Sequence, residues 1–94
     1  MKNYIEAFKL LHKAAEQGHA KAQHFLGECY SEGAGVVKND AEAYKWTLLA
    51  AAQGHEKARQ NASIIERRLP PGQRVECQRL AAEWQAKYEK ARAK

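Results

Sequence analysis

Apolar residues recur at intervals of three and four positions along most of the chain, which is the spacing of one face of an α-helix. This spacing predicts five helices, near residues 4–17, 20–32, 40–53, 56–68 and 72–91. The first and third predicted helices carry matching apolar faces, at Ala7, Leu10, Leu11 and Ala14, and at Ala43, Trp46, Thr47 and Ala50. The pattern predicts an all-α fold.

The chain repeats itself with a period of 36 residues. Residues 3–23 align with residues 39–59 with 11 identities among 21 positions, whereas chance gives about one or two. A repeat of this length usually corresponds to one supersecondary unit, so we interpret each copy as a helical hairpin. The first hairpin is expected over about residues 3–38 and the second over about residues 39–69.

Both copies carry the same signals for the beginning and end of a helix. Asn3 and Asn39 are each followed three residues later by a glutamate, the spacing of a capping box that begins a helix. Gly18 and Gly54 follow the last apolar position, where glycine accepts the left-handed conformation that ends many helices. Each copy is therefore expected to turn back on itself at its glycine.

The segments after each hairpin have distinct roles. Gly33 and Gly35 allow the chain to leave the first hairpin, and Val36 and Val37 offer an apolar anchor under that loop. Prolines then end the repeat register and favour a new helix over about residues 71–92. The apolar stripe of that last helix is Cys77, Leu80, Ala81, Trp84, Tyr88 and Ala91. One apolar face on a helix that is otherwise polar is typical of a capping helix.

Length and composition indicate one small domain over residues 1–94, because 94 residues leave no room for a second core. The longest apolar run, residues 48–52, is far shorter than the roughly 20 residues of a membrane span. The first 20 residues do not form a secretory signal. The chain as given is therefore expected in the cytoplasm, or in the periplasm or outside the cell behind a removed upstream signal.

The net charge of +5 arises in the C-terminal half, where residues 53–94 hold ten Lys and Arg against five acids. A basic half can attract nucleic acid or an acidic protein surface. The residues for this alternative are Arg59, Arg67, Arg68, Arg74 and Arg79. Glutamates interrupt the basic residues at helical intervals, so ion-paired, solvated helix faces are favoured over nucleic-acid binding.

The chemically reactive side chains do not form a catalytic or metal-binding pattern. The four histidines His12, His19, His24 and His55 contain no pair at i, i+4. Cys29 and Cys77 lie on apolar stripes and are expected to be small buried hydrophobes. We expect no metal, no cofactor and no catalytic residue, and hence no enzyme.

The residues resemble the Sel-one-like repeat family, a relative of the tetratricopeptide repeats, over nearly the whole chain. The resemblance rests on residues 14–23, on Leu26-Gly27 with Tyr30, on residues 33–36, on Asp40 with Ala43, and on Trp46, Ala50-Ala51, Gln53-Gly54-His55 and Ala58. It implies an α/α superhelix, a tetratricopeptide-like solenoid of two hairpins plus the capping helix. It also implies a protein-binding scaffold or adaptor. The residues expected to be structural are Gly18, Gly27, Gly33, Gly35, Gly54, Trp46 and Trp84.

The chain departs from the family at two places. One branch of the family joins each hairpin by a disulfide, but the corresponding positions here are Ala15 with Gln23 and Ala51 with Arg59. The second unit also lacks the Leu-Gly and Tyr signature.

The first helix of each hairpin is expected to line a groove that binds a protein or peptide. Leu48 and Leu49 interrupt the polar face of the second unit, so either the last helix covers them or they line this groove. The groove residues predicted from helical phase are Ile5, Lys9, His12, Glu16, Lys45, Leu48 and Ala52.

The N-terminal end of the stack is expected to need cover. Tyr4, Ile5, Phe8 and Leu11 have no preceding hairpin to pack on, and repeat arrays bury their apolar faces only against neighbours. Cover can come from residues outside the given sequence or from a second copy of the chain, and of the two we predict a homodimer joined through the first hairpin.

Overall fold

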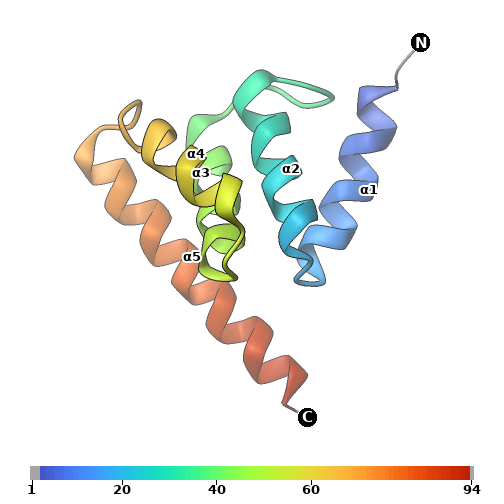
Figure 1. Ribbon diagram of the computed structural model, residues 1–94, viewed down its shortest axis with the longest axis vertical. Helices are drawn as coiled ribbons and strands as arrows, with labels where there is room; N and C mark the ends of the chain where they lie inside the picture. The colour runs from blue at the N-terminus through green and yellow to red at the C-terminus, as the bar shows by residue number, and fades with distance from the viewer. Residues whose placement is uncertain (1–2, 94) are drawn as a thin grey trace.

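The computed structural model describes residues 3–93, and in this range it contains five α-helices and no strand (Figure 1). The helices are α1 (Tyr4–Glu16), α2 (Ala20–Glu32), α3 (Asp40–Ala52), α4 (Glu56–Glu66) and α5 (Pro71–Arg92). Each predicted boundary lies within two residues of the observed one. The all-α prediction is confirmed.

The repeated cap signals form the same contacts in both hairpins. The side chain of Asn3 accepts a hydrogen bond from the backbone N–H of Glu6 at 3.1 Å, and Asn39 accepts from Glu42 at 3.0 Å. Gly18 and Gly54 have φ angles of +92° and +89°, a conformation that a residue with a Cβ adopts only with strain. The 36-residue repeat in the sequence is therefore a repeat of local backbone structure.

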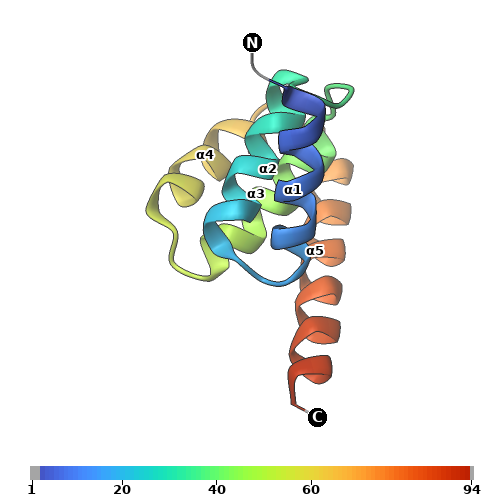
Figure 2. The same ribbon diagram turned by 90° about the vertical axis from the view of Figure 1, so that its right-hand side faces the viewer.

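The helices stack in chain order, with α2 between α1 and α3, and α3 in contact with α2, α4 and α5. The helices α1 and α5 lie toward one side of the stack and α4 lies toward the other (Figure 2). Two apolar clusters hold the stack together. The first joins α1, α2, α3 and α5 through Ala15, Ala22, Leu26, Trp46, Leu49 and Ala81, and the second joins α3, α4 and α5 through Ala43, Tyr44, Ile65, Leu69 and Cys77.

Glycine at position 27 allows α2 to approach α3 closely. A Cβ at this position would lie 2.5 Å from Thr47 Oγ1 and 3.2 Å from the carbonyl oxygen of Ala43. The Thr47 hydroxyl is held there because it donates a hydrogen bond to the same Ala43 carbonyl at 2.6 Å. The interface between the two hairpins therefore requires a residue without a side chain at this crossing.

The last helix packs on α3 and covers the Leu48–Leu49 pair. Leu49 is 2% exposed and shares a core cluster with Ala81 of α5, and Leu48 is half-buried. The Trp84 ring lies edge-on to Trp46 with ring centroids 5.8 Å apart. The Tyr88 hydroxyl of the same helix donates to the carbonyl of Gln17 at 2.8 Å. The last helix therefore buries Leu49, and Leu48 stays partly exposed beside it.

The sequence prediction is partly wrong for the apolar stripe of the last helix and for the apolar anchor under the loop between the hairpins. Leu80 and Ala91 of the α5 stripe are exposed, and so is Val37 in the loop. A helix of 22 residues is about 33 Å long and α3 with 13 residues is about 20 Å long. The C-terminal end of α5 therefore extends past the other helices (Figure 1), where nothing among residues 3–93 covers Ala91.

Candidate functional site

The residues predicted for the groove lie in separate environments. Ile5 and Lys9 are exposed on α1. The His12 ring lies edge-on to Trp46 at 5.8 Å, and its Nδ1 is 3.0 Å from Glu16 Oε1. Lys45 Nζ is 2.9 Å from Glu42 Oε2 and 5.0 Å from the centroid of the Trp46 ring. Trp46 thus brings His12 of α1 and Lys45 of α3 together.

The remaining two predicted groove residues face the last helix. Leu48 and Ala52 line a cavity of about 280 Å³ whose other walls include Gln78, Ala82 and Gln85 of α5. Because α5 packs on this side of α3, it forms one wall of the space that these two residues line. The sequence pattern does not reveal this because the path of α5 is set by its packing on α3.

A wider apolar groove lies at the N-terminal end of the stack, between α1 and α2. We call it the N-terminal groove, and its volume is about 480 Å³. Leu10 is 66% exposed, Tyr4 is 53% exposed and Phe25 is 39% exposed. The lining residues are Tyr4, Ala7, Leu10 and Leu11 of α1, Phe25, Glu28, Cys29 and Glu32 of α2, and Ala34. Exposed apolar side chains gathered in one place mark interaction sites on soluble proteins.

This groove only partly matches the uncovered end that the sequence predicts. Tyr4 and Ile5 are exposed as expected, but Phe8 and Leu11 are half-buried and pack on the first core cluster. The sequence pattern assigned Leu10 to the packing face of the first helix. The 36-residue shift is the signal that could have found Leu10, because its equivalent Trp46 is 3% exposed and packs on the first hairpin and on α5.

Cys29 also differs from its prediction, because it is half-buried in the wall of the N-terminal groove. Cys77 is buried as expected, and its Sγ donates to the carbonyl of Ala41 at 3.4 Å. Burial raises the pKa of both thiols, and at Cys29 the nearby Glu32 and Glu28 raise it further. Both thiols are therefore protonated at neutral pH.

Two carboxylates border the apolar wall of the N-terminal groove, at Glu28 and Glu32. Glu28 Oε1 is 3.7 Å from His24 Nε2. Burial lowers the pKa of His24, and His55 and Lys57 lower it further against the opposing effect of Glu28. His24 is consequently neutral at pH 7 and does not compensate the charge of Glu28.

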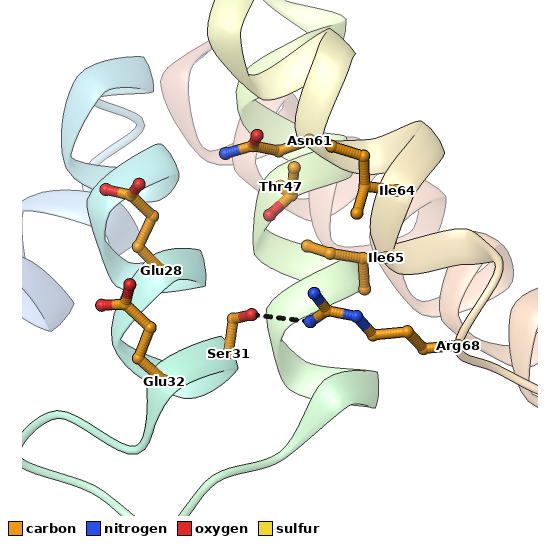
Figure 3. A pocket seen from close by; sticks show the side chains of 8 residues that line it. All are labelled: Glu28, Ser31, Glu32, Thr47, Asn61, Ile64, Ile65 and Arg68. Carbon is orange, nitrogen blue, oxygen red and sulfur yellow. Dashed lines mark hydrogen bonds between the residues drawn. The ribbon is translucent and has the colours of Figure 1, made fainter.

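The equivalent crevice between the two hairpins is shown in Figure 3, and its volume is about 210 Å³. Here Arg68 Nη1 donates to Ser31 Oγ at 3.2 Å and lies 3.8 Å from Asp40 Oδ1. The side chains of Glu28 and Glu32 point away from Arg68 in this view. The two acidic groups are thus not neutralised by the cation of the crevice.

Four of the five arginines proposed for nucleic-acid binding have partners within the chain. Besides Arg68, Arg59 Nη1 lies 3.7 Å from Glu56, and Arg79 pairs with Glu76 and with Glu83. Arg74 Nε donates to the carbonyl of Leu69 at 3.0 Å. The fifth, Arg67, is the exposed C-cap of α4. The pairs match the ion-paired helix faces that the alternation of charges indicates.

The histidines serve the helix ends and the contact between hairpins. His19 and His55 are the N-caps of α2 and α4, and His55 Nδ1 accepts the backbone N–H of Ala58 at 3.2 Å. The His24 and His55 rings stack with centroids 4.6 Å apart. Within residues 3–93 no group of three or more His, Cys, Asp or Glu side chains is arranged to hold a metal ion.

Two helical hairpins of related sequence, stacked with a further helix, define this chain as a helical-repeat protein. The family model of the Sel1 repeat matches residues 1–19 and 20–55, which is more than half of the chain, and the chain belongs to that family. Sel1 repeats form tetratricopeptide-like superhelices and generally mediate protein–protein interactions. No curated protein matches the chain. No helix among residues 3–93 is both long enough and apolar enough to span a membrane.

Proposed function

We propose that this chain is a non-catalytic scaffold or adaptor module that binds a protein or peptide, with the N-terminal groove as its main docking surface. The observation that carries the proposal is the exposure of Tyr4, Leu10 and Phe25 along one groove. Burial of the exposed parts of these three side chains contributes about 2 to 5 kcal/mol to the free energy of binding, before the costs of ordering and association are subtracted. That is enough to anchor a partner that makes further polar contacts.

The face around Trp46 is the second part of this proposal. His12 and Glu16 on α1 and Lys45 on α3 offer polar and charged groups to the same or a second partner, and Ile5 and Lys9 are exposed on the same helix α1. Leu48 and Ala52 contribute only through the cavity that they share with α5. Binding at this face is therefore expected to be weaker than in the N-terminal groove.

A second copy of the chain is the alternative occupant of the N-terminal groove. A homodimer through the first hairpin would cover Tyr4 and Leu10 with the same patch of the partner, since a two-fold interface is self-complementary. Light scattering of the chain over a range of concentrations distinguishes the two, because only the homodimer gives a doubled mass without a partner.

The test of the proposed function compares two exposed apolar residues. Leu10 is 66% exposed in the groove, and Val75 is 65% exposed on α5. Affinity capture from native lysate is expected to lose its specific partner with Leu10→Ser and to keep it with Val75→Ser. Equal capture by both variants would refute the groove as the docking surface. Circular dichroism of each variant checks that the helices remain folded.

A further inference from the structure

The two hairpins carry equivalent crevices, and among residues 3–93 only the crevice of the second hairpin is bordered by a helix of the other hairpin. A shift of 36 residues converts five lining residues of the N-terminal groove into five lining residues of the crevice in Figure 3. The equivalent pairs are Leu11 with Thr47, Phe25 with Asn61, Glu28 with Ile64, Cys29 with Ile65, and Glu32 with Arg68. The helix that packs there on the second hairpin is α2. The internal interface therefore shows what kind of element this surface accepts.

The packing of α2 defines the features of such an element. Gly27 lies at the closest approach to α3, and Leu26 joins the core cluster with Trp46 and Leu49. Four residues after Gly27, Ser31 Oγ accepts a hydrogen bond from Arg68. The helix that borders the internal crevice is thus amphipathic, with a small residue at the crossing, an apolar flank, and an acceptor group facing a cation.

The charge at the position of Arg68 is reversed in the N-terminal groove. Glu32 takes the place of Arg68, and Glu28 takes the place of the apolar Ile64. The walls of the groove are otherwise apolar, from Tyr4 and Ala7 to Cys29. A helix that docks here in the manner of α2 would therefore need a cation where α2 carries Ser31.

We propose that the N-terminal groove binds a basic amphipathic α-helix of a partner protein, with a small residue at the crossing and Lys or Arg facing Glu28 and Glu32. This inference rests on the proposed interaction function and specifies its partner. Electrostatic complementarity of this kind sets partner choice and association rate more than raw affinity.

The same charges make a second copy of the chain a poorer occupant. A second copy that presented α2 would bring its own Glu28 and Glu32 to this groove, with Ser31 between them. A two-fold dimer through the groove would place two acidic borders at one interface. Like charges brought together at an interface discriminate against that partner.

The experiment measures binding of two labelled helical peptides to the full chain by fluorescence anisotropy. One peptide has a Leu and Ala face, a central Gly and a Lys flank, and the other has Glu in place of every Lys. The basic peptide is expected to bind at least about tenfold more tightly. The double variant Glu28→Gln with Glu32→Gln should lose that preference, and Glu28→Lys with Glu32→Lys should reverse it. The control Glu89→Gln on α5 should change neither affinity.

Several outcomes would overturn the proposal. They are equal binding of both peptides, unchanged preference in the glutamine variant, or absence of binding by the basic peptide at millimolar concentration. A dimer in light scattering that Leu10→Ser converts to a monomer would assign the groove to a second copy instead. If Leu10→Ser abolishes partner capture while the peptide preference is absent, the interaction function stands and only the basic helix is refuted.

Discussion

Replacement of Gly27 by alanine tests whether close approach of α2 and α3 holds the two hairpins together. The added Cβ would meet Thr47 Oγ1 at 2.5 Å and the Ala43 carbonyl at 3.2 Å. Thr47 cannot simply rotate away, because its hydroxyl is bonded to that carbonyl and its side chain is 2% exposed. Gly27→Ala must therefore separate the helices or break this hydrogen bond.

The magnitude follows from two opposing effects. Overpacking of a close interface costs about 1 to 3 kcal/mol, whereas alanine in place of glycine inside a helix contributes about 0.5 to 1 kcal/mol. Because one of the two contacts is with backbone, we take the upper part of the overpacking range. The expected net loss is about 1 to 2.5 kcal/mol, which lowers the Tm by roughly 4 to 20 °C in a domain of this size.

Thermal unfolding followed by circular dichroism measures this change, with Gly72→Ala as the control. A Cβ at Gly72 meets nothing within 4 Å, and its φ is not in the left-handed region. Gly72→Ala should therefore leave the Tm unchanged or raise it. Combining Gly27→Ala with Thr47→Ala should cost less than the sum of the single changes, since the shorter side chain removes the nearest clash. An unchanged or higher Tm for Gly27→Ala alone would refute this account of the interface.

Three further predictions concern the thiols, one histidine and the last helix. With a thiol reagent at pH 7, both cysteines should label slowly because burial raises the pKa of each thiol. The half-buried Cys29 should label faster than the buried Cys77. Faster labelling of Cys77 would contradict this prediction. Because burial lowers the pKa of His24 in the folded chain, the unfolded state binds more protons just below its own pKa of about 6.5. The free energy of unfolding should therefore fall as the pH drops from 7 toward 5. His24→Gln should reduce that fall, which a comparison of Tm values at the two pH values measures. An equal fall in the variant would argue against His24 as the source of the pH dependence. Trp84→Ala should lower the Tm and speed tryptic cleavage within α5, because it removes the ring that packs on Trp46; unchanged proteolysis would show that α5 is held by other contacts.

The sequence by itself determined the helices and the repeat, because their signals act over short distances. The cap of Asn3 reaches a backbone N–H three residues away, and Gly18 ends its helix through its own φ angle. Such features are encoded within one or two turns and need no knowledge of the rest of the chain. The all-α class and the helix ends could therefore be predicted within two residues.

The surfaces were decided only by the tertiary structure, because burial depends on residues far apart in the chain. Leu10 and Trp46 occupy equivalent positions of the repeat, but only Trp46 is buried, among residues of α1, α2 and α5. Leu49 is buried because α5 returns to α3, and the same packing makes α5 a wall of the space that Leu48 lines. Local pattern indicates which face of a helix is apolar, whereas the order of packing decides which of those faces another helix covers and which remains free to bind a partner.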